Sequence, residues 1–295
     1  MCGIVGLMIR NPALRGRLGE WAQPMLVGMT ERGPDSAGIA VFTEPVADGL
    51  RKLSVNAPLG FDWGVLRATL GDGESLEVRA NHGTLVTPRD PVAARAALKA
   101  AFPQLLVLSA GRAIDLYKDV GTPLQIAEKY GLSGFAGTHL VAHTRMATES
   151  AVTPENAHPY TAGEDWCLVH NGSLSNPYSL RRKLEPLGIA FDGDCDTEAA
   201  CRWLEWRMRE GDSLEAALQK GFDELDGFYT FLMGTHDALA IVRDGFACKP
   251  ALVAETEDWV AIASEYRSLA HLPGVAKAKL YEPQPERIYA WRAAA

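Results

Sequence analysis

The sequence contains few cysteines, no long apolar run and no surplus of basic side chains. Its five cysteines are widely spaced and include no Cys-x-x-Cys pair, which argues against a disulfide framework and against a structural zinc site. Acidic residues (37) outnumber basic ones (29), and the net charge of −8 disfavours nonspecific binding to nucleic acid or to anionic membranes. Because no apolar run has membrane-spanning length and no signal sequence is recognisable, we expect a cytoplasmic protein without a membrane anchor.

Motifs for metals and nucleotide cofactors are also missing. Neither a phosphate-binding G-x-x-x-x-G-K-[ST] loop nor a G-x-G-x-x-G fingerprint occurs, so no ATP or dinucleotide site is expected. Residues 192–196 begin like a calcium loop, but Thr197 and Trp203 occupy the positions that require glycine and glutamate. His139 and His143 fall in a predicted strand, where they would lie about 13 Å apart, too far to share a metal ion. We therefore expect no metal or cofactor in this chain.

What the sequence does contain is an ordered set of apolar segments bounded by turn residues. With 295 residues, 47% of them hydrophobic, the chain can bury a sizeable core. The predicted strands are residues 2–9, 36–42, 61–68, 105–110, 138–148, 165–172, 228–235, 238–245, 250–255 and 259–264. The predicted helices are roughly residues 13–30, 90–102, 122–131, 177–188 and 196–211, with Asp196 as the expected N-cap of the last one. This order predicts an α+β layered fold, a single domain over residues 2–295 with residues 46–136 as an insertion or extension within it.

The position of Cys2, directly after the initiator methionine, distinguishes it from the other cysteines. A thiol is a good nucleophile only when its proton is removed, and free cysteine titrates near ~8.5. Removal of Met1 would expose an α-amino group with a pKa of about 7.7–8.0, which could take the thiol proton and return it to a leaving amine. Cys2 is therefore a candidate N-terminal nucleophile; the alternative is a cysteine that position 2 merely tolerates.

Three further segments could complete a site around such a nucleophile. Asn171 and Gly172 follow an apolar strand and could donate hydrogen bonds to an oxyanion, although Asn-Gly is also a common turn. Arg145, near the end of another predicted strand, could bind a carboxylate, or it could be a surface arginine. Asp196 could pair with an ammonium group as well as cap its helix. Together with attack by Cys2 on an amide, these groups describe a site for glutamine.

The same residues carry a resemblance to a known family. The motifs MCGIVG (1–6), ERGPDSAGIAVF (31–42), AHTRMAT (142–148), NAHPY (156–160), VHNGSLSN (169–176) and DCDTEAACRWLE (194–205) resemble, in this order, those of class II glutamine amidotransferases of the N-terminal nucleophile superfamily. The resemblance implies a four-layer αββα sandwich, in which two antiparallel sheets lie between helices. It also implies the site roles given above, together with support of the N-terminus by Arg32 and Gly33 and places in the glutamine pocket for Thr148 and His158.

Within this family, the long 46–136 stretch and residues 143–160 most resemble stand-alone subunits related to the glutaminase domain of glutamate synthase, such as the amidotransferase subunit of N-methylglutamate synthase. Such a protein would hydrolyse glutamine to glutamate and, in a multi-subunit complex, deliver ammonia to partner subunits that carry FMN and an iron–sulfur cluster. Relatives often have an aromatic residue directly after the arginine, where this chain has Met146. The alternatives are an N-terminal-cysteine amidase of another amide and a catalytically silent structural subunit of the same complex.

Overall fold

In the computed structural model, which describes residues 2–147 and 151–293, strand β1 (Gly3–Ile9) lies in the interior of the largest sheet. All seven of its residues are buried. Val5 and Leu7 face a helical layer and Ile4 faces a second sheet, because successive side chains of a strand alternate. A strand buried on both faces requires an unbroken apolar run, which is what this segment provides. Cys2 therefore lies at the end of a buried, central strand.

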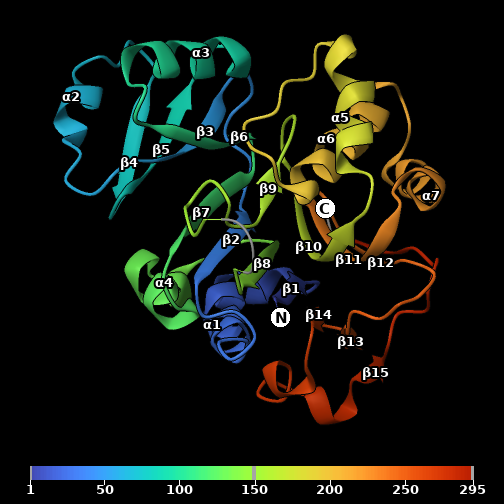
Figure 1. Ribbon diagram of the computed structural model, residues 1–295. Helices are drawn as coiled ribbons and strands as arrows, with labels where there is room; N and C mark the ends of the chain where they lie inside the picture. Colours follow the sequence, from blue (N-terminus) through green and yellow to red (C-terminus); the bar gives the residue numbers. More distant parts are fainter. Residues whose placement is uncertain (1, 148–150, 294–295) are drawn as a thin grey trace.

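Two large antiparallel sheets stack on each other (Figure 1). The first has seven strands, in the order β15 (Lys279–Tyr281), β13 (Leu252–Glu255), β14 (Trp259–Ala263), β1, β8 (His139–Arg145), β2 (Ser36–Phe42) and β7 (Ile114–Val120). The second has five, in the order β16 (Tyr289–Arg292), β12 (Ala238–Arg243), β11 (Gly227–Thr235), β10 (Trp166–Leu174) and β9 (Tyr160–Thr161). Apolar side chains from both sheets, among them Phe42, Leu232 and Ile262, form the core between them.

Helices cover the outer face of each large sheet. Helices α1 (Leu18–Val27) and α4 (Pro123–Tyr130) pack on the seven-stranded sheet, whereas α5 (Pro177–Leu184), α6 (Asp196–Arg209) and α7 (Leu214–Glu224) pack on the five-stranded sheet. Short 3-10 helices occur at η1 (Pro12–Arg17), η2 (Leu132–Gly134), η3 (Glu185–Leu187), η4 (Tyr266–Ser268) and η5 (Val275–Lys277). The order helix, sheet, sheet, helix confirms the αββα sandwich. None of the helices described here is both long enough and apolar enough to cross a lipid bilayer.

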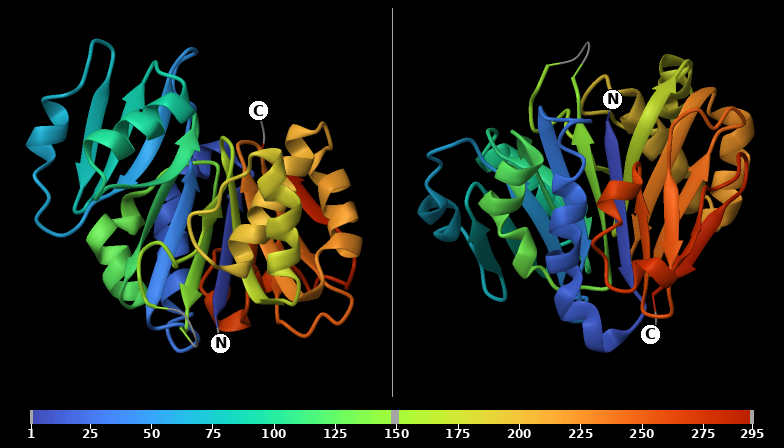
Figure 2. Two further views of the ribbon diagram at one scale, coloured as in Figure 1. Left: turned by 45° about the horizontal axis from the view of Figure 1, so that its top comes forward. Right: turned by 90° about the horizontal axis from the view of Figure 1, so that it is seen from below.

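A third, four-stranded sheet stands to one side of the sandwich, as both views in Figure 2 show. Its strands, in the order β4 (Ser75–Arg79), β5 (His82–Thr87), β3 (Arg51–Asn56) and β6 (Leu106–Gly111), share an apolar core with helices α2 (Trp63–Arg67) and α3 (Pro91–Ala101). Of the stretch 46–136 that we predicted as an insertion or extension, residues 51–111 make up this sheet and its helices. Strand β7 and helix α4, in contrast, belong to the layers of the sandwich.

Two predicted elements differ from those in the structure. Residues 61–68 were predicted as a strand, but residues 63–67 form α2. The Asp62 side chain accepts a hydrogen bond from Gly64 N at 2.8 Å and so caps the helical turn. The single helix predicted over residues 13–30 is divided into η1 and α1. In both segments a local cap or turn overrode the hydrophobic pattern.

Candidate functional site

Cys2 lies where three separate parts of the chain meet. Its side chain, directly before β1, is partly exposed. Its carbonyl oxygen accepts hydrogen bonds from Arg32 Nε at 3.0 Å and from Asn171 Nδ2 at 3.1 Å. Its Sγ lies 3.9 Å from the carbonyl oxygen of Met146, the residue after Arg145. The fold thus brings Cys2, Asn171 and the end of β8 into one region, although 169 residues separate Cys2 from Asn171 in the sequence.

Asn171 directs its amide towards Cys2 from the second sheet. The residue lies on β10, opposite Thr230 of β11. Besides the Cys2 carbonyl, its Nδ2 donates to Ser264 Oγ at 3.2 Å, and the same Oγ accepts from Ile4 N at 3.0 Å. Because Nδ2 meets two acceptors, the amide is oriented with its NH2 group towards the start of β1. Donation to an oxyanion beside Cys2 would replace one of these two bonds.

Gly172 follows Asn171 on β10 at a position where only glycine fits. Its φ of +144° lies in a region that favours glycine. A Cβ at this position would lie 2.0 Å from the carbonyl oxygen of Phe228 on β11, so any side chain would separate the two strands. The residue is exposed, and the missing side chain leaves the backbone beside Asn171 accessible.

Arg145 ends β8 and is nearly buried, at 9% exposure. Its Nη1 donates to the carbonyl oxygen of Ala151 at 3.2 Å. Gly33 packs directly behind it, since a Cβ on Gly33 would lie 2.6 Å from Arg145 N and 2.5 Å from the carbonyl carbon of Thr144. Gly33 therefore permits the close approach that holds the end of β8 in place. Thr148, predicted to line the glutamine pocket, lies outside the described residues.

Arg32 links the N-terminal segment to the region after β14. While Nε holds the Cys2 carbonyl, Nη1 pairs with Glu265 Oε1 at 3.0 Å. Glu265 also pairs through Oε2 with Arg267 Nε at 2.8 Å. Charge-assisted bonds of this kind hold a buried guanidinium in one orientation. Arg32 thus joins the start of β1 to Glu265, which the sequence did not single out, and its role in supporting the N-terminus stays a prediction.

Asp196 does not cap its helix, contrary to the prediction. It is the first residue of α6, and Cys195 occupies the N-cap position without a side-chain capping bond. The Asp196 carboxylate is turned instead towards β10, where Oδ2 accepts a hydrogen bond from Leu174 N at 2.9 Å. The carboxylate therefore satisfies the backbone N–H at the end of β10 and no N–H of its own helix. The Asp196 side chain is 25% exposed. Asp196 thus lies near the strand that carries Asn171.

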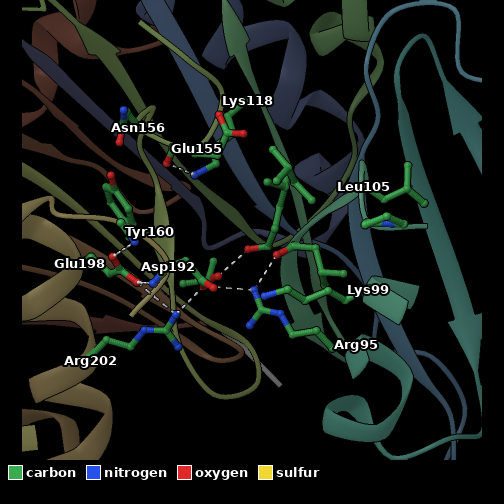
Figure 3. Close-up of a pocket in the computed structure, with 16 residues that line it drawn as sticks. Arg95, Lys99, Leu105, Lys118, Glu155, Asn156, Tyr160, Asp192, Glu198 and Arg202 are labelled. Carbon is green, nitrogen blue, oxygen red and sulfur yellow. Dashed lines mark hydrogen bonds and ion pairs between the residues drawn. The ribbon is translucent and has the colours of Figure 1, made fainter. Parts of the chain in front are cut away.

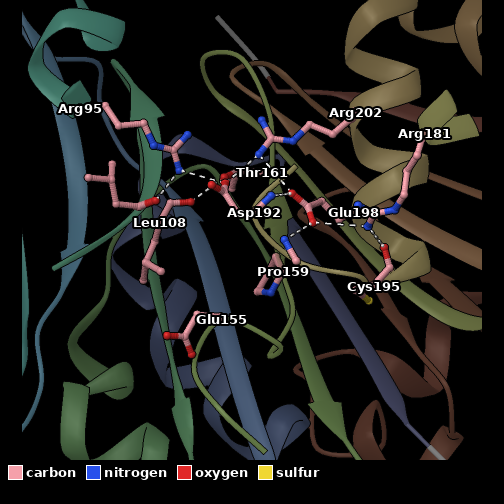
Figure 4. A network of polar contacts seen from close by, with 12 residues as sticks. Arg95, Leu108, Glu155, Pro159, Thr161, Arg181, Asp192, Cys195, Glu198 and Arg202 are labelled. Atoms are coloured by element: carbon pink, nitrogen blue, oxygen red, sulfur yellow. Dashed lines mark hydrogen bonds and ion pairs between the residues drawn. The ribbon is translucent and has the colours of Figure 1, made fainter. Parts of the chain in front are cut away.

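The loop that leads to Asp196 is held by Glu198 (Figure 4). Glu198 is buried, and its oxygens accept hydrogen bonds from Asp192 N at 2.8 Å and Gly193 N at 3.0 Å. Arg202 and Arg181 pair with the same carboxylate at 3.3 and 3.7 Å. Within the part of the chain described, no group of three or more His, Cys, Asp or Glu side chains is arranged to hold a metal ion. Through the two bonds to Asp192 N and Gly193 N, Glu198 ties the acidic segment 192–196 to α6.

Three buried imidazoles lie close to these residues. His143 is on β8, His170 is on β10, and His158 Nδ1 lies 3.1 Å from His143 Nε2. Burial lowers the pKa of all three histidines, that of His143 to about 3, so the rings are neutral near neutral pH. One neutral ring can donate a hydrogen bond to the other. His158 supports β8 through this contact, and its place in the glutamine pocket stays a prediction.

The buried histidines lead us to expect that stability falls as the pH drops below about 6.5. Burial lowers the pKa of His82 to about 3, of His139 to about 4 and of His143 to about 3. In the unfolded chain these groups titrate near ~6.5, so below that pH the unfolded state binds more protons and the free energy of unfolding decreases. Denaturant midpoints measured between neutral pH and about pH 5, above the range in which ordinary carboxylates titrate, would isolate this effect.

Two variants provide the control for the acid effect. His139→Gln removes a buried imidazole and should reduce the pH dependence of the unfolding free energy. His236→Gln removes an imidazole whose side chain is 69% exposed and serves as the comparison for loss of an exposed histidine. An unfolding free energy that stays constant over this window in the wild type would contradict the prediction.

Sequence reasoning missed three residues that hold the candidate site together. Ser264 and Glu265 follow β14 and act on Asn171 and Arg32, and Glu198 acts on the loop before α6. A signal was present for the first two, because Ser264 ends the apolar strand predicted at residues 259–264 and Glu265 directly follows it. Their partners, however, lie far away in the sequence, so the pattern alone could not assign these contacts.

Comparisons with known proteins agree with one another. A family model described as a glutamine amidotransferase domain matches residues 143–271. The chain is 42% identical to the glutamine amidotransferase-like protein GlxB of Rhizobium meliloti, over 99% of this chain and 98% of that protein. It is 33% identical to the glutamine–fructose-6-phosphate aminotransferase of Shewanella oneidensis, over 43% of this chain and 21% of that protein. The solved glutamine phosphoribosylpyrophosphate amidotransferase from B. subtilis has a similar fold (TM-score 0.61, 19% identity), and the match covers 99% of this chain and 49% of that chain.

Proposed function

The chain belongs to the class II glutamine amidotransferases, and from this premise we propose that it hydrolyses L-glutamine through a Cys2 thioester and delivers the ammonia to a partner protein. Because the chain belongs to this family, it is a glutamine amidotransferase. The proposal concerns the chemical mechanism, the residues that perform it and the partner that receives the ammonia.

The proposed reaction begins when removal of Met1 has freed the α-amino group of Cys2. This amine takes the thiol proton, and Sγ attacks the side-chain amide carbon of glutamine. As the C–N bond breaks, the leaving nitrogen takes the proton and departs as ammonia, which leaves a thioester between Cys2 and the glutamyl group. Water then attacks the thioester carbon, one of its protons returns to Sγ, and glutamate leaves. One glutamine and one water thus give one glutamate and one ammonia.

We assign the remaining roles to four residues. Arg145 would hold the α-carboxylate with its planar guanidinium, and Asp196 would pair with the α-ammonium group. Asn171 Nδ2 and the backbone N–H of Gly172 would stabilise the oxyanion that forms beside Cys2. The close contacts of Cys2 with Asn171 and with the residue after Arg145 support this assignment.

The observation that carries the proposal is the hydrogen bond from Asn171 Nδ2 to the Cys2 carbonyl oxygen, because it joins the predicted oxyanion donor to the predicted nucleophile. The test combines the intact mass of the native protein with glutamine hydrolysis in the presence of hydroxylamine. We expect a chain that begins at Cys2, equal amounts of glutamate and ammonia, and diversion of the thioester to glutamyl hydroxamate. Retained Met1 without glutamate formation would favour the silent structural role, and equally fast hydrolysis of N-acylated glutamine would favour an amidase of another amide.

We further propose that the ammonia acceptor is a glutamate-synthase-like complex, as for the amidotransferase subunit of N-methylglutamate synthase. The similarity of residues 143–160 to that group supports this choice. FMN and an iron–sulfur cluster would then lie on the partner subunits. Affinity purification from the native host, followed by flavin and iron determination on the copurified proteins, tests this assignment. A stable complex that contains neither flavin nor iron would contradict it.

Replacing Arg145 with lysine should weaken glutamine binding. Lysine keeps the charge but loses the planar fork, so we expect KM for glutamine to rise at least about tenfold. Because the α-carboxylate is held in both ground and transition states, kcat should change little. Steady-state kinetics measure this, with the exposed Arg182→Lys as the matched control. An unchanged KM in Arg145→Lys would mean that the carboxylate is bound elsewhere.

A further inference from the structure

Lys118 on β7 is a buried lysine that the proposed mechanism does not use. Its side chain is 5% exposed, and its Nζ donates to three main-chain carbonyl oxygens, those of Glu155 at 3.3 Å, Ala157 at 2.8 Å and Pro159 at 3.4 Å. Figure 3 shows Lys118 beside Glu155. The ammonium also lies 4.9 Å from the centre of the Tyr160 ring. Among residues 2–147 and 151–293 it forms no ion pair with a carboxylate.

A buried ammonium without a carboxylate partner is costly unless each of its hydrogens is matched by an acceptor. Lysine has three such donors, and the three carbonyl oxygens come from a span of only five residues. The bonds therefore fix the backbone of residues 155–159, the second half of the segment 151–159, which we call the 151–159 loop. A neutral side chain of the same length could not make these three bonds.

The 151–159 loop contacts Arg145 through the carbonyl group of Ala151. Ala151 O accepts hydrogen bonds from Arg145 Nη1 at 3.2 Å and from Asn156 Nδ2 at 3.2 Å. Lys118 in turn holds the carbonyls of Glu155 and Ala157, on either side of Asn156. A continuous chain of contacts thus runs from Lys118 through Asn156 and Ala151 to the guanidinium.

We propose that Lys118 is a positioning residue for glutamine, which fixes the 151–159 loop and thereby orients the Arg145 guanidinium for the substrate carboxylate. The inference rests on the proposed function of Arg145. It assigns to the strand β7 a role in substrate affinity, although Lys118 itself does not touch the substrate in this arrangement. Its loss should therefore raise KM for glutamine and leave the chemical step largely unchanged.

Lys118 also lines a cavity of about 380 Å³ between α3, β6 and α6. The cavity gives water access to the carbonyl groups when the lysine is replaced, so the fold should survive Lys118→Met.

Several titratable groups face Lys118. They are His82 on β5, Glu155 and His158 on the 151–159 loop, Tyr160 on β9, Cys195 before α6, and Glu198 and Cys201 on α6.

Burial among these groups lowers the pKa of Lys118 to about 8. Below that pH the ammonium offers three donors to the three carbonyls. Above it, the neutral amine loses one donor and turns a lone pair towards a carbonyl oxygen. In the wild type, KM for glutamine should therefore rise as the pH increases beyond the pKa of Lys118. This dependence should be absent from Lys118→Met.

The experiment compares Lys118→Met with Lys52→Met in the full chain. Lys52 is also buried, but its Nζ is paired with Asp115 on β7 at 2.8 Å and bonds to Thr43 Oγ1 at 2.8 Å, so its contacts join β3 to the sandwich and do not hold the 151–159 loop. We expect Lys118→Met to raise KM about three- to tenfold with kcat within about twofold of wild type. Hydrogen exchange of residues 151–159 should accelerate in Lys118→Met only, whereas both variants should lower the thermal midpoint.

Asn156→Ala breaks the same chain of contacts at an exposed side-chain bond and serves as a second variant if Lys118→Met folds poorly. It should raise KM in the same way, and the double variant should show no additional increase. If the wild type hydrolyses glutamine but KM stays unchanged in both single variants, the positioning role is overturned and the proposed function stands. If the wild type does not hydrolyse glutamine at all, the proposed function fails and the KM inference fails with it.

Discussion

Cys2→Ala is expected to abolish glutamine hydrolysis, with a loss of at least about 10⁴-fold in kcat. Alanine keeps the backbone carbonyl that Arg32 and Asn171 hold, so the start of β1 should remain in place. What it removes is the Sγ atom, and with it the thioester on which the proposed reaction depends. Glutamate formation measured in the purified protein, together with the thermal midpoint, tests this expectation.

The other cysteines provide a matched control for the nucleophile. Cys248 is an exposed free cysteine, so Cys248→Ala should keep wild-type activity. A second arm retains the thiol but blocks the amine, for example by inserting a bulky residue after Met1 so that the methionine is not removed. This variant should be as inactive as Cys2→Ala, because the thiol then lacks its base. Substantial glutaminase activity in Cys2→Ala would eliminate the thioester mechanism.

Asn171→Ala is expected to have the second-largest effect, a loss of about 10²–10³-fold in kcat. Its Nδ2 group lies 3.1 Å from the Cys2 carbonyl oxygen, beside the place where the oxyanion would form. Because the oxyanion exists only in the tetrahedral transition state and intermediate, KM should change far less than kcat. Steady-state kinetics with glutamine separate the two parameters.

Two variants separate the catalytic role of Asn171 from its structural one. Ser264→Ala removes one of the two acceptors that orient the amide but leaves the amide itself, so its loss in kcat should be much smaller. Asn176→Ala removes a half-buried asparagine away from Cys2, whose Nδ2 donates to the Glu224 carbonyl at the end of α7, and it should have no effect on kinetics. If Ser264→Ala and Asn171→Ala lose the same activity, the amide acts by holding β1 and not by stabilising the oxyanion.

Much of the fold could be predicted because its signals are local. Strands β1 and β8 and the first six residues of β10 are buried, as their apolar patterns predicted. Strand β10 continues beyond the predicted end to Leu174. Helix α4 begins at a capping box formed by Thr122 and Gln125 and ends at Gly131, all visible in the sequence. The errors occurred where weak hydrophobic patterns competed with a cap, as at Asp62.

The residue types of the candidate site could also be predicted, but their contacts could not. Cys2, Arg145, Asn171 and Asp196 were chosen because their chemistry suits an amide and an amino acid. The structure gave Asp196 a different local role, since its carboxylate binds Leu174 N on β10 and does not cap α6. A capping bond depends on neighbours in the chain, whereas this bond depends on how α6 packs on the second sheet.

The sequence by itself determined many of the strands and helices, including β1, β2, β8 and α6, and the family that their motifs resemble. Only the tertiary structure decided that Asn171 reaches the Cys2 carbonyl, that Ser264 orients the amide, and that Lys118 fixes the loop beside Arg145. The physical reason is that secondary structure follows from side chains a few residues apart. These contacts instead depend on the register of strands and the stacking of two sheets, which join residues up to 169 positions apart in the case of Cys2 and Asn171.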